Sequence, residues 1–484
     1  MTASKAKRLG LVLSTAGLLG VAGCVSVGPN YQPPELRVAD AWNAELVKGF
    51  TPGDGSGPGD WWTVFDDVHL NKLISLSTSN SLDLRIAVLR IEEAAALRGI
   101  SRSDWYPNIA GQGTARGTQV SAASNPALPD GSDRSSELYQ LGVGVAWELD
   151  LWGRVRRSVE SADASLAAVT EDYRDTLVVL HAALASAYSE VRTLQQRIAF
   201  AEKNIELQQG TLNLTSNRYE AGLTSKLDVR QAELNLATTT SSLPSLKAQL
   251  AQAMNRVGVL VGQEPSRYWP DLKTDAPIPD PPQDLAVGVP IDVLRQRPDV
   301  RATERRLAAQ TAKIGVAKAD LYPTFSLPGT FVLEALESGD LSGSDSLAYS
   351  FGPSFTWNLF TGGAVRNRIA AEEARTAQAL ASYEKSVLVA VEEVENAMAA
   401  LEQERHRLQA LGEAVEAARD SVELVKTLYS SGLADFQNVL DMERSLARQE
   451  DQLALSQGAR AQSAIQLYKA LGGGWTPAEE LKEE

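Results

Sequence analysis

Apolar side chains recur at alternating intervals of three and four residues over two long stretches of the chain. One stretch runs from Leu177 to Leu212, and the other, 210 positions later, runs from Val387 to Val422. A 3.5-residue period sustained over this length predicts helices that pack as left-handed coiled coils. Proline is absent from 154–221 and 364–435, so we expect helices of roughly 90–100 Å at 1.5 Å per residue.

A glycine follows each long helical stretch, and a second helical stretch follows each glycine. Gly222 and Gly432 stand where a C-terminal cap is expected. The pattern therefore predicts two long helical hairpins, 154–262 and 364–472, each with a glycine at its tip. Pro244 is expected to kink or interrupt the returning helix of the first hairpin.

Alternation of apolar and polar residues marks four shorter segments, at about 108–120, 138–151, 324–335 and 347–360. Strands of about ten residues cross a bilayer when tilted, and a transmembrane barrel places apolar side chains outside and polar ones inside. By this rule, the side chains that face lipid are Trp147, Leu149, Phe355 and Trp357. The side chains that face a lumen are Glu148, Asp150 and Asn358.

The four strands of one chain are too few to close a barrel, and an open sheet edge is untenable in lipid. This interpretation therefore requires oligomerisation. Two chains would supply eight strands, whose interior is filled by side chains, and three would supply twelve, which leave room for a lumen. A trimer is the better match to a conducting protein. The alternative is a soluble β-sandwich with one solvated face, which leaves the long helices unexplained.

Short motifs show that the chain is an internal duplication. "DWYPN" from Asp104 recurs as "DLYPT" from Asp320, and "RYEAGLTSKLDV" from Arg218 matches "LYSSGLADFQNV" from Leu428. The segments are repeat 1 at 66–262, a proline-rich linker at 263–290, repeat 2 at 291–472 and a C-terminal tail at 473–484. Each repeat contains two of the predicted strands and one hairpin.

The N-terminus has the pattern of a bacterial lipoprotein signal. Three basic residues precede a short apolar run that ends in "VAGC", and the run is shorter than the about 20 residues of a spanning helix. We therefore predict a signal peptide at 1–23 and lipidation of Cys24, followed by an extended segment at 24–65. Several acyl chains anchor a protein stably, and Val25 favours the outer membrane of a Gram-negative bacterium.

Composition and motif content exclude several classes of function. The net charge of −15 disfavours a nucleic-acid partner, because phosphate binding needs basic clusters. Cys24 is the single cysteine, so an intramolecular disulfide is excluded, and the three histidines are too dispersed for a metal site. No P-loop, dinucleotide fingerprint or nucleophile–base motif is present. We predict no enzyme activity, no metal and no cofactor other than the covalent lipid on Cys24.

These motifs resemble those of the outer-membrane factor, or TolC-like, family. The similar segments are "VGPNYQPP" after Cys24, "WELDLWGRVRR" and the duplicated hairpins. They are most similar to the lipoprotein branch that serves resistance–nodulation–division (RND) efflux pumps. The resemblance implies a mainly α protein with a transmembrane β-barrel segment. In it, a homotrimer builds a twelve-helix α-barrel that continues into a twelve-stranded outer-membrane β-barrel.

The same resemblance implies a function and partners. The trimer would be the passive exit duct of a tripartite efflux pump, lipid-anchored in the outer membrane and extending into the periplasm. An inner-membrane RND transporter would supply the energy, and a periplasmic adaptor (a membrane fusion protein) would dock at the hairpin tips. The alternative from another class is a structural lipoprotein, a periplasmic tether without a lumen.

Family motifs also place functional residues on the second hairpin. The acidic constriction position corresponds to Asp441, its basic partner to Arg444 and the tip tyrosine to Tyr429. A position that is often a bulky apolar plug is Gln437 here, which predicts a polar constriction. Heptad continuity assigns Tyr429, like Tyr219, to core packing. The alternative for Asp441 and Arg444 is a solvated pair without a gating role.

The hairpin tips are the predicted contact with the adaptor. Their residues are Gly222, Leu223, Thr224, Ser225, Gly432, Leu433, Ala434 and Asp435. Glycines that merely cap their helices are compatible with this role.

Overall fold

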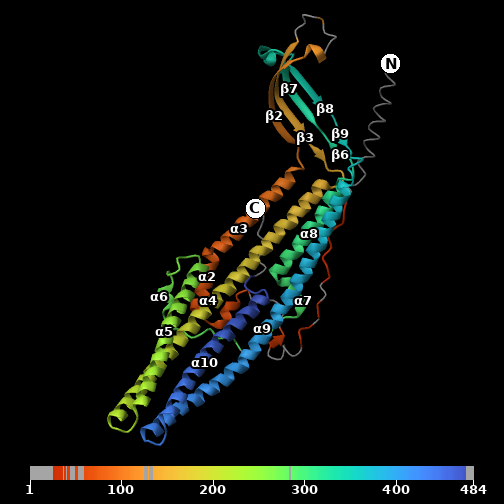
Figure 1. Ribbon diagram of the computed structural model, residues 1–484. Helices are drawn as coiled ribbons and strands as arrows, with labels where there is room; N and C mark the ends of the chain where they lie inside the picture. Colours follow the sequence, from red (N-terminus) through yellow and green to blue (C-terminus); the bar gives the residue numbers. More distant parts are fainter. Residues whose placement is uncertain are drawn as a thin grey trace. The chain divides into compact units, whose positions relative to one another are not determined.

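The computed structural model describes residues 26–35, 38–39, 41–43, 50–52, 59–124, 129, 134–282 and 285–475 (Figure 1). The predicted signal peptide, Cys24 and the end of the C-terminal tail lie outside the described residues. The chain forms two compact units. Unit 1 comprises 1–34, 91–168 and 303–383, and unit 2 comprises 35–90, 169–302 and 384–484. Each unit takes segments from both repeats, so the repeats are not separate domains.

The helices reproduce the duplication residue by residue. The long helices α4 (Arg154–Glu220) and α9 (Ala364–Ser430) have 67 residues each, about 100 Å at 1.5 Å per residue. Their returning helices, α5 (Lys226–Leu260) and α10 (Phe436–Ala470), have 35 residues each. Helices α3 (Leu82–Ser103) and α8 (Pro298–Ala319) have 22 residues each. Equal lengths at an offset of 210 residues confirm the two predicted hairpins, and α3 and α8 correspond at an offset of 216.

The interruption that Pro244 could have caused in the first hairpin does not occur. Helix α5 continues through Pro244 without an interruption. Pro244 removes a single amide donor, the one that would bond to the carbonyl of Thr240. The helix nevertheless runs on through the proline to Leu260.

Several short elements accompany the long helices. The helical ones are η2 (Trp61–Phe65), α2 (Val68–Asn80), η3 (Ala122–Ser124), α6 (Trp269–Leu272), α7 (Pro290–Gln296) and η4 (Ser338–Ser342). Strands β1 (Phe50–Pro52) and β5 (Leu285–Val287) pair in parallel in unit 2. Asp67 caps α2, because its Oδ1 accepts from the amides of His69 and Leu70.

The predicted strands lie in unit 1, where three of the four are broken. One sheet has the order β2 (Asn108–Gln119), β3 (Ser135–Ala146), β7 (Gly329–Ala335) and β8 (Leu347–Phe351). A smaller sheet has the order β4 (Glu148–Leu149), β6 (Thr324–Ser326) and β9 (Ser354–Thr356). The breaks fall at Trp147, at Pro328 and at Pro353, and the prolines lack the amide that a central ladder needs.

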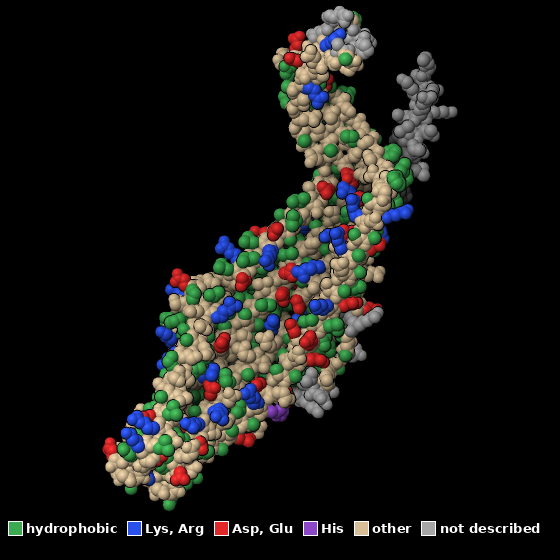
Figure 2. Space-filling view, viewed as in Figure 1, with side chains coloured by type: hydrophobic (Ala, Val, Ile, Leu, Met, Phe, Trp, Pro, Cys, Tyr) green, Lys and Arg blue, Asp and Glu red, His purple; other side chains and the backbone are tan. Residues whose placement is uncertain are grey.

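The register of the larger sheet separates an apolar face from a polar one. Residues directly opposite in antiparallel strands share a face. The apolar face carries Ile109, Leu141, Val143, Val145, Phe331, Leu333, Leu347, Tyr349 and Phe351. The opposite face carries Gln112, Thr114, Gln140, Gly142, Gly144, Thr330 and Ser350. Most of the large apolar side chains are exposed in the single chain, and Figure 2 shows few charged side chains over the middle of these strands.

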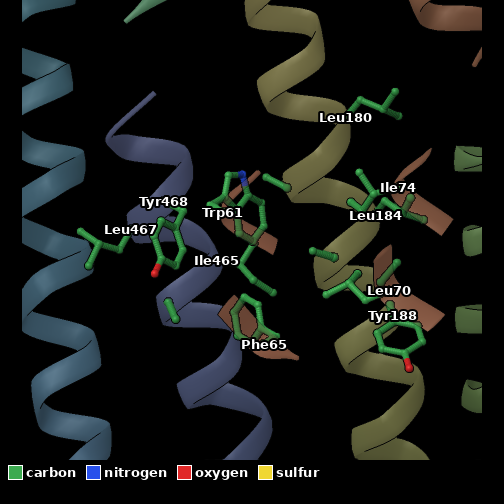
Figure 3. Close-up of a cluster of buried hydrophobic side chains, with 14 of the residues drawn as sticks. Trp61, Phe65, Leu70, Ile74, Leu180, Leu184, Tyr188, Ile465, Leu467 and Tyr468 are labelled. Carbon is green, nitrogen blue, oxygen red and sulfur yellow. The ribbon is translucent and has the colours of Figure 1, made fainter. Parts of the chain in front are cut away.

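The main hydrophobic core belongs to unit 2. Trp61 stacks on Tyr468 of α10 with ring centroids 5.3 Å apart, and Leu184 and Tyr188 of α4 are fully buried nearby (Figure 3). Segments from the start, middle and end of the chain therefore share one core. Within the described residues, the structure contains no helix whose length and hydropathy together would allow it to cross a membrane.

His181 makes the stability of unit 2 dependent on pH. The ring is 3% exposed, and its Nε2 lies 2.9 Å from Thr78 Oγ1. Burial lowers the pKa of His181 from 6.5 to about 4. The unfolded chain therefore takes up a proton first as the pH falls, so this contribution to stability is complete above pH 6.5 and is lost on the way to pH 4.

We expect the apparent melting temperature to fall between pH 7 and pH 4.5, and His181→Asn to remove part of this fall. The full loss corresponds to about 3 kcal/mol, at 1.36 kcal/mol per pKa unit. Calorimetry of the detergent-solubilised protein measures it. His69→Asn is the matched control, because His69 is exposed. An identical pH dependence in all three proteins would contradict the assignment to His181.

Candidate functional site

The hairpin tips are built by the same backbone turn in both repeats. The Gly222 amide donates to the carbonyl of Tyr219 (2.9 Å), and the Leu223 amide donates to that of Arg218 (2.8 Å). The corresponding bonds of the second tip begin at Gly432 and Leu433. Gly222 and Gly432 have φ values of +73° and +76°, which only glycine adopts without strain. The predicted capping role of both glycines is confirmed.

The tips differ in how the returning helix begins. Ser225 caps α5 in a reciprocal capping box with Asp228, and Thr224 also donates to Asp228. Asp435, at the corresponding position before α10, makes no side-chain capping bond. Leu223 and Leu433 are both exposed, Leu433 to 76%. The structure therefore presents a leucine at each tip on a rigid turn.

Tyr429 lies in an inter-hairpin core, not on an exposed surface. Its ring is buried 5.4 Å from that of Phe436, and the guanidinium of Arg218 lies 4.8 Å from its centroid. Arg218 also donates to the carbonyl of Ser430 (2.7 Å), so it joins the two tips. The packing role predicted for Tyr429 agrees with this arrangement. Tyr219 was wrongly assigned to the core, because its side chain is exposed.

The structure separates Asp441 from its predicted basic partner. Asp441 Oδ1 accepts from Gln437 Nε2 at 2.9 Å, and both residues are exposed on α10. The Nε atom of Arg444 instead donates to Asn235 Oδ1 on α5 at 3.0 Å. Among the described residues, Arg444 forms no ion pair with Asp441. The two side chains point to different neighbours because they leave the helix at different angles.

Two buried glutamates of α10 were not predicted. Glu443 accepts from Thr211 of α4 and, at 3.5 Å, from Asn235 Nδ2. Glu450 accepts from Arg419 of α9 at 3.0 and 2.7 Å and from Asn204 of α4 at 2.7 Å. Their seven-residue spacing, in phase with Leu446, was the signal in the sequence that could have revealed them.

These glutamates face a polar stripe of α4. Asn204, Gln208, Thr211 and Thr215 are all buried, at intervals of four, three and four residues. The apolar pattern had placed Ile205 and Leu212 in this part of the seam, and both are only partly buried. A straight α-helix drifts by about 20° per heptad relative to a strict seven-residue repeat, which accounts for the change of phase.

The residues assigned to a lumen have local partners in unit 1. Glu148 Oε1 accepts from Arg154 Nε at 2.7 Å. Asp150 accepts from the amides of Val155 and Arg156, at 3.0 Å each. Asp150 therefore caps the first turn of α4, and its side chain is 4% exposed; its place on a lumen stays a prediction. The alternation could not show this, because capping depends on the helix that follows.

The residues assigned to lipid fall at the small sheet. Leu149 and Phe355 share a face with Phe325, and Glu148 lies on the opposite face. Trp147 lies in the break before β4, where its Nε1 donates to the carbonyl of Trp105 (3.0 Å). Trp357 follows β9 and donates to Leu321 (3.1 Å), and Asn358 follows it, exposed. Both tryptophans thus fasten the strands to the ends of α3 and α8.

The polar groups of the described residues act in packing and capping. Over the described part of the chain, no group of three His, Cys, Asp or Glu side chains is placed to hold a metal ion. The notable polar groups lie between helices and at exposed tips, where they control packing and contact.

Comparison with known proteins covers almost the entire chain. The model of the outer membrane efflux protein family matches residues 73–263 and 289–473. Nodulation protein T of Rhizobium leguminosarum bv. trifolii is 30% identical over 467 residues, 94% of this chain and 96% of that protein. The solvent efflux pump outer membrane protein SrpC of Pseudomonas putida is 30% identical over 473 residues, 96% and 98% of the two chains.

Solved structures agree with these relatives. The outer-membrane channel OprN superimposes with a TM-score of 0.86 at 37% identity, covering 93% of this chain and 100% of that one. The open state of the Neisseria gonorrhoeae MtrE outer membrane channel superimposes with a TM-score of 0.81 at 28% identity, covering 93% and 98%. Members of the outer membrane efflux protein family are transport proteins and not enzymes. This mainly helical chain, with its duplicated hairpins and a sheet that has one apolar face, belongs to that family.

Proposed function

We propose that three copies of this chain form a closed duct that passively conducts substrates out of the cell. The protein is an efflux channel of the Gram-negative outer membrane, as its family and relatives establish. The trimer, its twelve-stranded barrel and its twelve-helix barrel are our proposal for how the channel is built. The proposal rests on the larger sheet of unit 1, which has one exposed apolar face and, among the described residues, two edge strands without a further partner.

Physical constraints of the membrane support this assembly. Strands β2 and β8 form the two edges of the larger sheet, and in lipid their free amides and carbonyls need partners. Further copies of the same sheet satisfy both edges if the ring closes. Twelve strands leave room for a lumen, whereas eight are filled by side chains. The apolar face then meets lipid and the polar face lines the lumen.

The segment after Cys24 supports a lipid anchor next to this sheet. The Val27 amide donates to the carbonyl of Trp152 at 3.0 Å. Arg157, at the start of α4, is buried and donates to the Val27 carbonyl and to Asn30 Oδ1 at 3.2 and 2.7 Å. Val27 is therefore held at the junction between β4 and α4. A lipid on Cys24, three residues earlier in the chain, would be tethered to that junction.

The hairpin tips would dock a periplasmic adaptor, and an inner-membrane RND transporter would supply energy. Relatives are named for solvent, toluene and antibiotic efflux pumps. A shared architecture with such different cargoes supports a duct that takes its substrate from a transporter. At the closed end, Gln437 and Asp441 would line a polar constriction with one carboxylate per chain, because Gln231 stands at the corresponding position of repeat 1.

Mass and conductance test this function together. We expect three chains per particle when the protein, extracted from outer membranes in mild detergent, is measured by light scattering. The same particles should give single-channel steps in a lipid bilayer. Particles of one chain, or trimers that never conduct, would overturn the duct and favour a periplasmic tether.

The constriction is tested by Asp441→Ala. Removing three carboxylates that repel one another and bind cations should raise the conductance of the closed channel several-fold. Single-channel recording measures the effect. The matched control is Gln231→Ala, the same position in repeat 1, for which we expect wild-type conductance. Wild-type conductance of Asp441→Ala itself would reject its role in gating.

Adaptor docking is tested by Leu433→Glu. A charge on this exposed side chain should reduce cross-linking to the adaptor at least tenfold, because desolvating an unpaired carboxylate at an interface is unfavourable, while trimers remain intact. Leu336→Glu is the control, since Leu336 is similarly exposed in the segment between β7 and β8. Undiminished cross-linking of Leu433→Glu would show that the adaptor binds elsewhere.

A further inference from the structure

Glu443 is a buried carboxylate at the contact between the two hairpins. It lies on α10 and is 1% exposed. Thr211 of α4 donates to its Oε1, and Asn235 of α5 lies 3.5 Å from its Oε2. Leu440, one turn toward the tip, belongs to the small apolar cluster that contains Tyr429 and Phe436. A negative charge is thus inserted where hairpin 2 packs on both helices of hairpin 1 (Figure 1).

The contrast with Glu450 shows what Glu443 lacks. Both are buried to 1% on the same face of α10. Glu450 has the guanidinium of Arg419 at 2.7 Å, whereas among the described residues no Lys or Arg forms an ion pair with Glu443. Its contacts are a neutral hydroxyl and a neutral amide. Because burial of a charge is unfavourable unless a partner of opposite charge offsets it, a buried carboxylate without an ion pair destabilises the packing around it.

The surrounding charges offset this cost only in part. Lys426 of α9 is the cation that acts on Glu443 directly. Arg444 acts through Asn235, since it binds the amide oxygen while the amide nitrogen faces Glu443. The buried neighbours on α4, such as Gln208 and Thr215, are uncharged. Burial therefore raises the pKa of Glu443, against the opposing effects of the Thr211 hydrogen bond and of Lys426.

Repeat 1 provides an internal comparison. Glu233 occupies the corresponding position on α5, 210 residues earlier. Its side chain is 42% exposed and pairs with Arg230 at 2.6 Å. The same residue type is thus solvated and paired in one repeat, and buried without an ion pair in the other. Only the position on α10 couples ionisation of the glutamate to contact between hairpins.

We propose that Glu443 sets the balance between packed and separated hairpins: its negative charge weakens the contact of α10 with α4 and α5, and its protonation strengthens that contact. Separation would restore water to the carboxylate. The packed state therefore binds the proton more tightly, so acidification favours packing and a rise in pH favours separation. The consequence for conduction rests on the proposed duct, but the consequence for packing does not.

Hydrogen–deuterium exchange of the full-length protein tests the packing at pH 7. Glu443→Gln keeps the shape and can still accept from Thr211, but it carries no charge. We expect several-fold slower exchange in 205–217 and 437–448 than in the wild type. Glu233→Gln should leave both segments unchanged. Faster or unchanged exchange in Glu443→Gln would overturn the proposal, because the carboxylate would then hold the hairpins together or have no effect.

Measuring hydrogen–deuterium exchange over a range of pH gives a second test, because a purely structural role of Glu443 would not make the exchange depend on pH. After correction for intrinsic exchange rates, the wild type should become more protected in these segments between pH 7.5 and pH 5.5. Glu443→Gln should lose this dependence, and equal pH dependence in both proteins would overturn the proposal. Bilayer recordings distinguish the packing proposal from the proposed duct. We expect a lower open probability for Glu443→Gln than for the wild type. Absence of conduction in every variant would overturn the duct but not the effect of Glu443 on packing.

Discussion

The side-by-side packing of α4 and α10 is the interaction on which the helical part of the molecule depends. These helices come from different repeats, and their contact holds both hairpins in one unit. Its composition changes along its length. Near Leu184 and Ile465 the contact is apolar and buried. Burial of apolar surface stabilises the folded chain by about 25 cal/mol per Å², so this part of the contact contributes most to stability. Toward the tips it becomes polar at Asn204 with Glu450 and at Thr211 with Glu443. The contact is therefore less apolar near the tips than in the core of unit 2.

In the proposed duct the strands meet a different constraint, the absence of water from the bilayer core. The sheet has apolar side chains on one face and small or polar ones on the other, and β2 and β8 pair with no further strand among the described residues. In that proposal, further copies of the chain would pair with these two edges. The tryptophans Trp147 and Trp357 bind carbonyls at the ends of α3 and α8. The strands are therefore linked to the ends of α3 and α8 by the same kind of hydrogen bond in both repeats.

Duplication explains both the regularity and the specialisation of this channel. The two repeats share helix lengths and tip turns, so the same backbone serves twice. Their side chains diverge where they meet different neighbours. Asp441 corresponds to Gln231 and buried Glu443 to partly exposed Glu233. The acidic side chains Asp441 and Glu443 distinguish α10 of the second hairpin, while the capping box of Ser225 and Asp228 stabilises the tip of the first.

The sequence by itself determined the elements that local periodicity encodes. The heptads, the capping glycines and the alternating segments predicted both hairpins and all four strand regions, because each depends on residues close in the chain. Only the tertiary structure decided which surfaces meet. It paired α4 with α10 across the repeats, moved the seam from Ile205 to Asn204, directed Arg444 to Asn235, and made Asp150 a helix cap. A periodic pattern shows that one face of a helix is covered, but the identity of the covering helix, and the drift of a 3.6-residue helix against it, depend on the whole fold.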